Sequence, residues 1–479
     1  MQAVIVLQVS HVPSVNLCLF LVTNENIETN APSSPCISNL FRHFGGFAIA
    51  EESNDSNELT EKLESSYHSM GLKQTTIIQL PQIEYKVNLG SISTYFIMLK
   101  AFIGIGVMYI PSYFSQMGYM VCIQIMCIST LVIGYGISKL IKCYGKFRVS
   151  YSILIGIVTF KCFQPFISFL LFIGSLTYGA VYMNYAVRNV TTYISCFIYC
   201  DSINVTKFIS ILVILFIISP LLCIRNWPKY YILFNISSVL LIMTLFSFSV
   251  PVAMIKKDLI LVAYNEPTIK KLVYFIGTYS FSLEGFGTAI AFYQRTSIKG
   301  LYNIVFLFIM GTVLLLQILF GIFLSTVGDK REPPLPILDS TTLAEVLKFP
   351  ATYSYCLSLL YLLCIIPGYY LTLLPALHRL EQILKYFFPI TGCKGYTRHI
   401  ARIIFGIITI LLGLLIDSSI ATIAVIMGYS ICIPLMVIFP GVVHFLLIAE
   451  SVMEKVLDMG LIVVGSGAIV FAIASLALI

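Results

Sequence analysis

The sequence predicts an all-α integral membrane protein of about eleven transmembrane helices, built as an inverted repeat of five plus five helices. Three observations lead to this fold class. Hydrophobic residues make up 58% of the chain and charged residues only 11%, with a mean hydropathy of +0.93, whereas a soluble domain carries about 25% charged residues. Apolar runs of roughly 20 residues, the length of a helix that crosses a bilayer, recur along the chain. Two of these runs, five helices apart, contain a Gly-x-Gly motif.

The first 86 residues differ from the rest of the chain. Residues 24–64 are rich in Ser, Asn and Glu and lack helical periodicity, so residues 1–86 are predicted to be a disordered cytosolic tail. The apolar stretch at 1–22 contains a His and a Pro and has no basic region or clear cleavage site, which argues against a signal peptide. Residues 87–479 are predicted to form the transmembrane domain.

Polar or turn-forming residues separate the apolar runs that follow the tail. The least certain ends lie around Arg225-Asn226-Trp227-Pro228-Lys229 and at Asp417. The predicted spans are 97–117, 119–141, 163–188, 207–224, 230–252, 272–293, 301–326, 352–377, 399–416, 419–447 and 459–479.

The net charge of +7 arises from Lys and Arg residues that collect in the loops. This pattern is a membrane topology signal and does not indicate a nucleic acid partner. With a cytosolic tail, fifteen Lys and Arg residues lie in the cytosolic loops and nine in the opposite loops. Because basic loops favour the cytosolic side, a cytosolic N-terminus is predicted, although the loop at 255–271 has the opposite bias.

The 13 cysteines are scattered, and most lie in apolar runs, where a thiol behaves as a small hydrophobe. Cys196 and Cys200 lie in a predicted polar loop with glycosylation sequons at Asn189 and Asn204, and two free thiols are favoured there over a disulfide. No zinc-ligand spacing occurs, so neither a metal site nor a cofactor is predicted.

Glu284 is the only acidic residue near the middle of a long apolar run. A carboxylate at bilayer depth is costly and usually functional. Gly285 and Gly287 come immediately after it in the chain, and glycines allow a helix to open and leave backbone polar groups free to meet a ligand. The first span has a corresponding motif at Gly104 and Gly106.

A five-helix offset between interrupted spans is what an inverted repeat produces, with a ligand site near the midplane where the interruptions meet. Half-helix N-termini there present unpaired N–H groups to an anion such as a carboxylate. The alternative is that each Gly-x-Gly only allows two helices to pack closely. The presence of both motifs, with Glu284 beside one of them, favours the ligand site.

The two interrupted spans resemble those of the amino acid/auxin permease family. The opening helix of that family follows Leu-Lys-x-x-x-Gly-x-Gly-x-x-x-x-Pro, and the sixth helix of its proton-coupled branch follows Phe-x-Phe-Glu-Gly-x-Gly. The first pattern is met by Leu99, Lys100, Gly104, Gly106 and Pro111, and the second by Phe281, Glu284, Gly285 and Gly287. Weaker similarity extends the resemblance over residues 85–479. Tyr293-Gln294-Arg295 stands where the proton-coupled branch usually has a Glu-Asn pair, which leaves the substrate class open.

The resemblance implies a LeuT-like fold of the APC type and secondary active transport of amino acids by alternating access. Transport in this family is often driven by protons and in some branches by sodium. Site residues follow by analogy: backbone of Ile103, Gly104, Ile105 and Gly106 for the substrate carboxylate, Tyr279, Phe281 and Gly285 for its ammonium and side chain, and Tyr178 and Tyr370 as lining residues, for which packing is the alternative.

Glu284 is the candidate proton-coupling residue, since burial disfavours an ionised carboxyl. The alternative is a structural role in accepting hydrogen bonds from N–H groups freed by the broken helix. A weak sodium site would use the backbone near Phe102 and the hydroxyl of Thr372, but residues 365–370 contribute few hydroxyls, so proton coupling is favoured.

Other classes of membrane protein fit the sequence less well. An enzyme needs a nucleophile and base or a similar cluster near one membrane face, and none stands out, so the chain is predicted not to be an enzyme. A channel presents repeated polar rings. A membrane receptor that senses an amino acid without net transport shares every motif and stays open. The membrane, whether plasma membrane or vacuolar or lysosomal, has no visible address in the sequence.

Overall fold

The computed structural model describes residues 89–147, 150–159, 163–197, 203–224, 227–255, 268–325, 351–387, 394–416 and 419–477. Apart from one isolated β-bridge, the regular elements in these ranges are helical. The predicted tail at 1–86, residue Cys200 and the side chain of Cys196 lie outside what the structure describes.

The helices follow the predicted spans closely. Nine helices among the described residues are long and apolar enough to cross a membrane, and a bent pair, α3 with the segment after it, makes a tenth. The predicted sixth span at 272–293 corresponds to two shorter helices, α10 and α11. The elements are α3 (Ser91–Phe102), η2 (Ile105–Tyr109), α4 (Ile110–Met117), α5 (Tyr119–Phe147), α6 (Tyr151–Val158), α7 (Phe163–Phe197), α8 (Ile203–Leu222), η3 (Trp227–Tyr230), α9 (Tyr231–Ile255), α10 (Ile269–Ser282), α11 (Phe286–Arg295), η4 (Lys299–Leu301), α12 (Tyr302–Leu324), α14 (Ala351–Phe387), α15 (Lys394–Leu415), α16 (Ile420–Met427), η6 (Gly428–Cys432), η7 (Pro434–Ile438), α17 (Phe439–Leu447) and α18 (Val452–Ala477).

Several helices extend beyond the apolar runs that predicted them. The third span was predicted to end at residue 188, but α7 continues to Phe197, and α14 is 37 residues long despite Pro367 and Pro375 inside it. Hydropathy marks only the part of a helix that contacts lipid or core, whereas the backbone continues until a turn stops it. The short helix α6 was not predicted, because eight residues are too few to cross a membrane.

This extension corrects one prediction directly. Asn189 was expected in a polar loop, but it lies inside α7, only 1% exposed, and its side-chain amide donates to the carbonyl of Tyr185 at 2.9 Å. Asn204, in the first turn of α8, is exposed.

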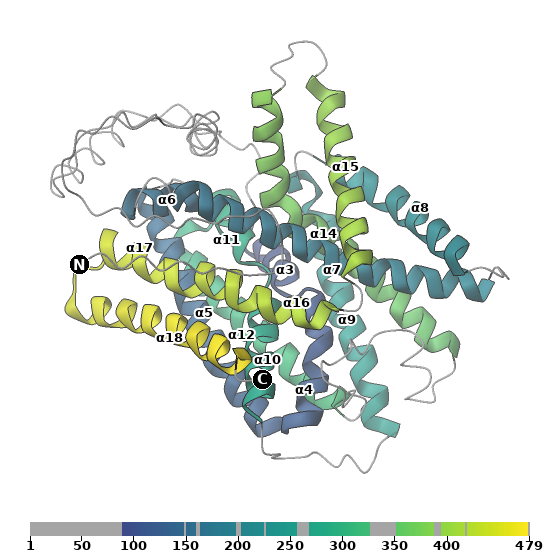
Figure 1. The fold of residues 1–479 in the computed structure, drawn as a ribbon, viewed down its shortest axis with the longest axis horizontal. Coiled ribbons are helices and arrows are strands. Elements are labelled where there is room, and N and C mark those ends of the chain that lie inside the picture. The colour runs from purple at the N-terminus through teal and green to yellow at the C-terminus, as the bar shows by residue number, and fades with distance from the viewer. Residues whose placement is uncertain are drawn as a thin grey trace.

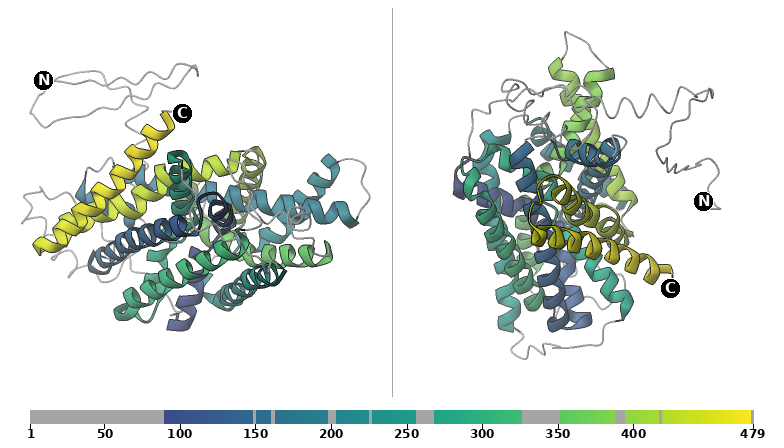
Figure 2. Two further views of the ribbon diagram at one scale, coloured as in Figure 1. Left: turned by 90° about the horizontal axis from the view of Figure 1, so that it is seen from below. Right: turned by 90° about the vertical axis from the view of Figure 1, so that its left-hand side faces the viewer.

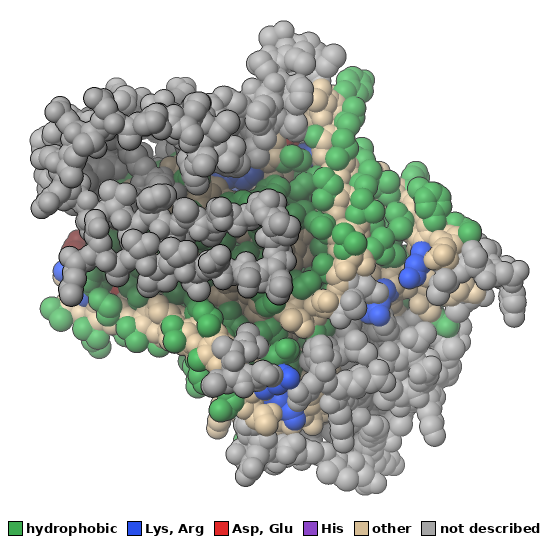
Figure 3. All heavy atoms as spheres, viewed as in Figure 1, with side chains coloured by type: hydrophobic (Ala, Val, Ile, Leu, Met, Phe, Trp, Pro, Cys, Tyr) green, Lys and Arg blue, Asp and Glu red, His purple; other side chains and the backbone are tan. Residues whose placement is uncertain are grey.

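The interrupted helices lie at the centre of the bundle, and α18 lies at its edge (Figure 1). In the apolar window of α14, 83% of the residues are buried, whereas only 22% are buried in that of α18. The two further views show α18 along the outside of the other helices (Figure 2). Hydrophobic side chains cover the outward faces of α8 and α15 (Figure 3), as expected of surfaces that contact lipid.

The first and sixth spans run antiparallel and are joined near both ends. At one end Leu89, which precedes α3, donates its N–H to the carbonyl of Arg295 (2.9 Å) and accepts from the N–H of Ser297 (3.0 Å). At the other end the hydroxyls of Tyr113 in α4 and Thr278 in α10 are 2.9 Å apart. An antiparallel pair is what two repeats of opposite membrane topology produce from their first helices.

A second polar connection joins α5, α17 and α18 near one membrane face. His444 Nδ1 is 2.6 Å from Asp458, and Lys139 Nζ is 3.5 Å from His444 Nε2. All three side chains are buried. Because each charge has a partner, the cluster ties the peripheral α18 to the bundle at a polar contact inside an otherwise apolar interface.

Candidate functional site

The first span is interrupted just after α3. Ile103 and Gly104 have extended backbones (φ −103°, ψ 94° and φ −109°, ψ −154°), and the chain then resumes as the 3₁₀ turn η2. The two helical halves meet at an angle of 50°. Two extended residues cannot continue the i to i−4 hydrogen bonds, so backbone groups are freed inside the protein core.

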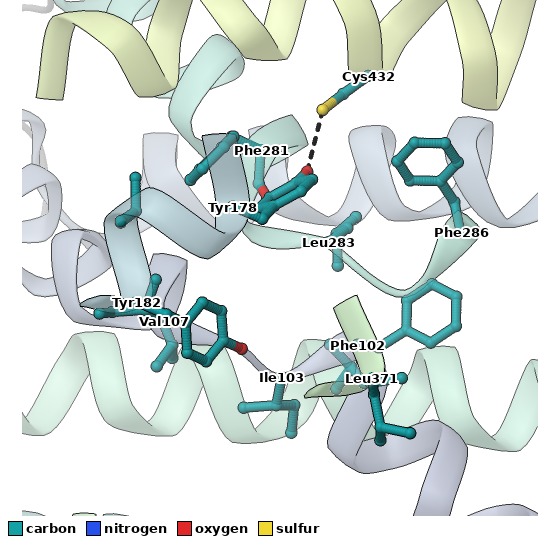
Figure 4. Packing of buried hydrophobic residues seen from close by; sticks show 14 of the residues in the cluster. Phe102, Ile103, Val107, Tyr178, Tyr182, Phe281, Leu283, Phe286, Leu371 and Cys432 are labelled. Carbon is teal, nitrogen blue, oxygen red and sulfur yellow. Dashed lines mark hydrogen bonds between the residues drawn. The ribbon is translucent and has the colours of Figure 1, made fainter. Parts of the chain in front are cut away.

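The sixth span is interrupted between Ser282 and Phe286. Leu283 leaves the helical conformation (φ −91°, ψ 64°), and Glu284 and Gly285 connect α10 to α11. Figure 4 shows Leu283 on this connecting stretch, between Phe281 and Phe286. The carboxylate of Glu284 is therefore attached to a non-helical segment and not to a helix face.

The two breaks lie directly against each other, and glycines make the approach possible. A Cβ atom on Gly104 would collide with the carboxylate of Glu284. A Cβ on Gly106 would lie 2.5 Å from the Cα of Ser282, and one on Gly285 would lie 2.5 Å from the ring of Phe102. Real Cβ atoms do not approach so closely, so each of these three positions requires glycine at the observed spacing.

Within the described part of the chain, three polar side chains at this junction have no hydrogen-bond partner. Both oxygens of Glu284, Nζ of Lys100 in α3 and the hydroxyl of Tyr182 in α7 are buried and unbonded. The carboxylate faces Tyr182 and the N–H groups of Ile105 and Gly106 and interacts electrostatically with Lys100, but none of these contacts has the geometry of a hydrogen bond. Figure 4 shows the Tyr182 hydroxyl directed toward the first break, beside Ile103. Unsatisfied buried polar groups are rare in proteins, so their concentration at the junction makes it the candidate functional site.

An aromatic wall closes one side of the junction. The Tyr178 ring stacks on Phe281 with centroids 4.4 Å apart, and its hydroxyl donates to the Phe281 carbonyl at 3.0 Å. The same hydroxyl is 3.1 Å from Sγ of Cys432 (Figure 4). Cys432 ends the π-helical turn η6, and such turns occur frequently at functional sites. The hydroxyl of Tyr361 in α14 lies 3.4 Å from the Gly104 carbonyl and donates to it.

The sequence pattern described as "Transmembrane amino acid transporter protein" matches residues 88–478, which is most of the chain. The chain belongs to this transporter family. No curated protein sequence matches it.

Solved structures show the fold of the transporter. It resembles MhsT in complex with L-phenylalanine, with a TM-score of 0.55 and 12% identity over 82% of this chain and 100% of that one. It also resembles Mhp1, a nucleobase-cation-symport-1 family transporter. The TM-score is 0.50 and the identity 12% for the closed conformation with bromovinylhydantoin, which covers 74% of this chain and 78% of that one. For the inward-facing conformation of Mhp1 the TM-score is 0.52 and the identity 10%, over 75% of this chain and 77% of that one. The transporter therefore has the LeuT-like fold that the sequence predicted.

The structure brings most of the predicted site residues of the transporter together. Ile103, Gly104, Ile105 and Gly106 form the first break, Phe281, Glu284 and Gly285 lie at the second, and Tyr178 stacks on Phe281 beside the second break.

Three further predicted residues have their hydroxyls engaged in other contacts. Tyr279 bonds Thr130 in α5 at 2.6 Å, and Tyr370 donates to the carbonyl of Ile224 at 2.7 Å. Thr372, a candidate in the predicted sodium site, donates to the carbonyl of Tyr369 at 2.9 Å.

Lys100, Tyr182, Tyr361 and Cys432 lie at the junction but were not predicted as part of the site. Lys100 entered the sequence analysis only as a residue of the family pattern. A basic residue in the same apolar span as a Gly-x-Gly motif could have indicated a site residue. Tyr182 had no signal of its own, because nothing in the sequence distinguishes it among 29 tyrosines.

Proposed function

We propose that this transporter moves amino acids across its membrane by alternating access, and that Glu284 carries the coupled proton. The observation that supports this proposal best is a buried carboxylate without a hydrogen-bond partner, located where two antiparallel broken helices meet. A carboxyl group in such surroundings has no fixed charge partner in contact, so it is free to gain and lose a proton as its surroundings change.

The freed backbone groups suit the substrate as well. Backbone N–H groups at Ile105 and Gly106 face the Glu284 carboxylate in this conformation, and backbone carbonyls lie at Phe281 and Gly104. Such groups are complementary to the carboxylate and ammonium of an amino acid. MhsT, which shares the fold, is described in complex with the amino acid L-phenylalanine.

Alternating access has support from the same fold. Mhp1 has been captured both closed and facing inward. We place the end of the molecule that carries Leu89 and Arg295 at the cytosolic face, because the loops on this side carry more basic residues. The transporter is then a multi-pass protein of the plasma membrane or of a vacuolar or lysosomal membrane, with a cytosolic N-terminus.

Reconstitution into proteoliposomes tests the proposal. Labelled standard L-amino acids are offered with the outside more acidic than the inside, and we expect at least one of them to accumulate. Binding without accumulation would instead indicate a sensor, and accumulation driven by a sodium gradient alone would indicate sodium coupling.

The Glu284→Gln variant tests the proton role. Glutamine keeps the shape of the side chain but takes up no proton, so accumulation driven by the pH gradient should be lost while exchange of internal for external amino acid continues. Glu454→Gln, which changes a partly exposed carboxylate near Lys139, is the matched control. Unchanged dependence of Glu284→Gln on the pH gradient would exclude the proton role.

A further inference from the structure

The proposed function assigns no role to Lys100. This residue lies in the last turn of α3, three residues before the first break begins at Ile103, and it is fully buried. Its ammonium has no hydrogen-bond partner among the described residues. Its side chain reaches toward α14, where Gly368 leaves room: Cε and Nζ are 3.1 and 3.2 Å from the point at which a Cβ on Gly368 would lie. A buried ammonium without a partner is strongly unfavourable, and an anion beside it would remove this cost.

The surroundings of Lys100 define which groups an anion beside it would meet. The Tyr182 hydroxyl is 3.3 Å from the same point, so the ammonium of Lys100 and the hydroxyl of Tyr182 both lie next to Gly368 of α14. Glu284 lies across the break and attracts Lys100 electrostatically, but no ion pair joins the two in the described part of the chain. The titratable groups that face Lys100 and Glu284 are Tyr178, Tyr182, Tyr361, Cys364 and Cys432.

We propose that Lys100 binds the α-carboxylate of the substrate and that Glu284 competes for it when the site is empty. This assignment rests on the proposed function. In the empty site Glu284 attracts Lys100 electrostatically. Protonation of Glu284 removes the competing negative charge. The α-carboxylate of the substrate then binds beside Lys100 and the Tyr182 hydroxyl.

This competition explains how one proton and one amino acid move together. The empty site holds one positive and one negative side chain and is neutral. The loaded site holds a protonated Glu284, the Lys100 cation and a zwitterion, so it differs from the empty site by one positive charge. The ligand class is therefore a free α-amino acid, and a derivative whose carboxylate is converted to an amide lacks the group that Lys100 binds.

Binding of an acid and of its amide to the purified full-length protein tests the assignment. The standard L-amino acids are screened, and the one that binds best is compared with its carboxamide. For wild type we expect a preference for the acid of about tenfold or more, because hydrogen bonds between charged groups are stronger than neutral ones. Glu284→Gln should keep or increase this preference.

Lys100→Met should lose the preference, with acid affinity lowered about tenfold or more and amide affinity little changed. The double variant Lys100→Met, Glu284→Gln removes both charges and provides the test if Lys100→Met does not fold. It should lack the preference for the acid, as Lys100→Met does. Lys139→Met, which removes a buried lysine beside His444 and Asp458, is the matched control and should keep the preference.

The outcomes separate this assignment from the function on which it rests. If wild type binds none of the amino acids, the proposed function fails and the assignment fails with it. If wild type binds them but Lys100→Met keeps the preference for the acid, the assignment alone is wrong. If Lys100→Met loses the preference but the double variant regains it, Lys100 only balances the charge of Glu284. That result would also overturn the assignment.

Discussion

Gly104 and Gly106 show how single residues set the distance between the two broken helices. Each occupies a point at which a Cβ atom would overlap the sixth span, but the neighbours differ. Gly104 faces the end of a side chain, Glu284, whereas Gly106 faces the backbone of Ser282. A side chain can rotate away from an added methyl group, but backbone can move only if a helix moves.

Gly106→Ala should therefore be the more damaging of the two substitutions. We expect it to destabilise the protein by about 1–3 kcal/mol and to abolish uptake, because the breaks are forced apart. Gly104→Ala should lower uptake while the melting temperature falls less, since Glu284 is displaced but the backbone stays. Gly311→Ala in α12 is the control, because nothing lies within 4 Å of the added atom. The melting temperature and the uptake of all three variants are measured. Equal effects of Gly104→Ala and Gly106→Ala would contradict the prediction.

At the scale of elements, the pairing of the first and sixth spans closes one side of the site. The backbone bonds between Leu89, Arg295 and Ser297 lie at the end where α3 begins and α11 stops. Next to them the hydroxyls of Thr94 and Thr296 are 3.1 Å apart and buried. In the proposed transport cycle, access from the cytosolic side requires this contact to separate, because it lies between the breaks and the face that we place in the cytosol.

A cross-link between the two spans should consequently stop transport. In the double variant Thr94→Cys, Thr296→Cys, oxidation should form a disulfide and reduce uptake to background, and a reductant should restore it. The single variants and wild type, treated with the same oxidant, control for the native cysteines. Full uptake by protein shown to be cross-linked would mean that this contact does not open during transport.

At the scale of the whole molecule, the number of spans determines where the ends of the chain lie. In the described part of the chain, nine single helices and the bent first span are long and apolar enough to cross a membrane. We count the pair α10 and α11 as one further span, which gives eleven. An odd number places the two ends of the domain on opposite sides. With a cytosolic N-terminus, the end of α7 and the start of α8 lie on the outer or lumenal side.

Glycosylation provides a test of this topology. In a cell that glycosylates Asn-x-Ser/Thr sequons, Asn204 should accept a glycan, because it is exposed at the start of α8. Asn189, buried and bonded to Tyr185, should not. Asn204→Gln should then increase mobility on a gel, whereas Asn189→Gln should leave it unchanged. A glycan on Asn189, or an opposite result for the pair, would contradict the placement of α7.

The spans and the two breaks were predictable because they depend on local composition. Apolar runs of sufficient length become membrane helices wherever they occur, and Gly104, Gly106 and Gly285 mark interruptions through their own backbone freedom. The helix ends were less predictable. Asn189 was placed in a loop because it is polar, whereas α7 continues past it and its side-chain amide donates to the carbonyl of Tyr185 one turn earlier.

The sequence by itself determined that this protein crosses a membrane many times, that its first and sixth spans are broken, and that Glu284 is a buried acid at one break. These are properties of residue type and spacing along the chain. Only the tertiary structure decided which residues meet Glu284. Gly104, Lys100 and Tyr182 come from two other helices, and their convergence at one junction depends on how the helices pack, which local sequence does not encode.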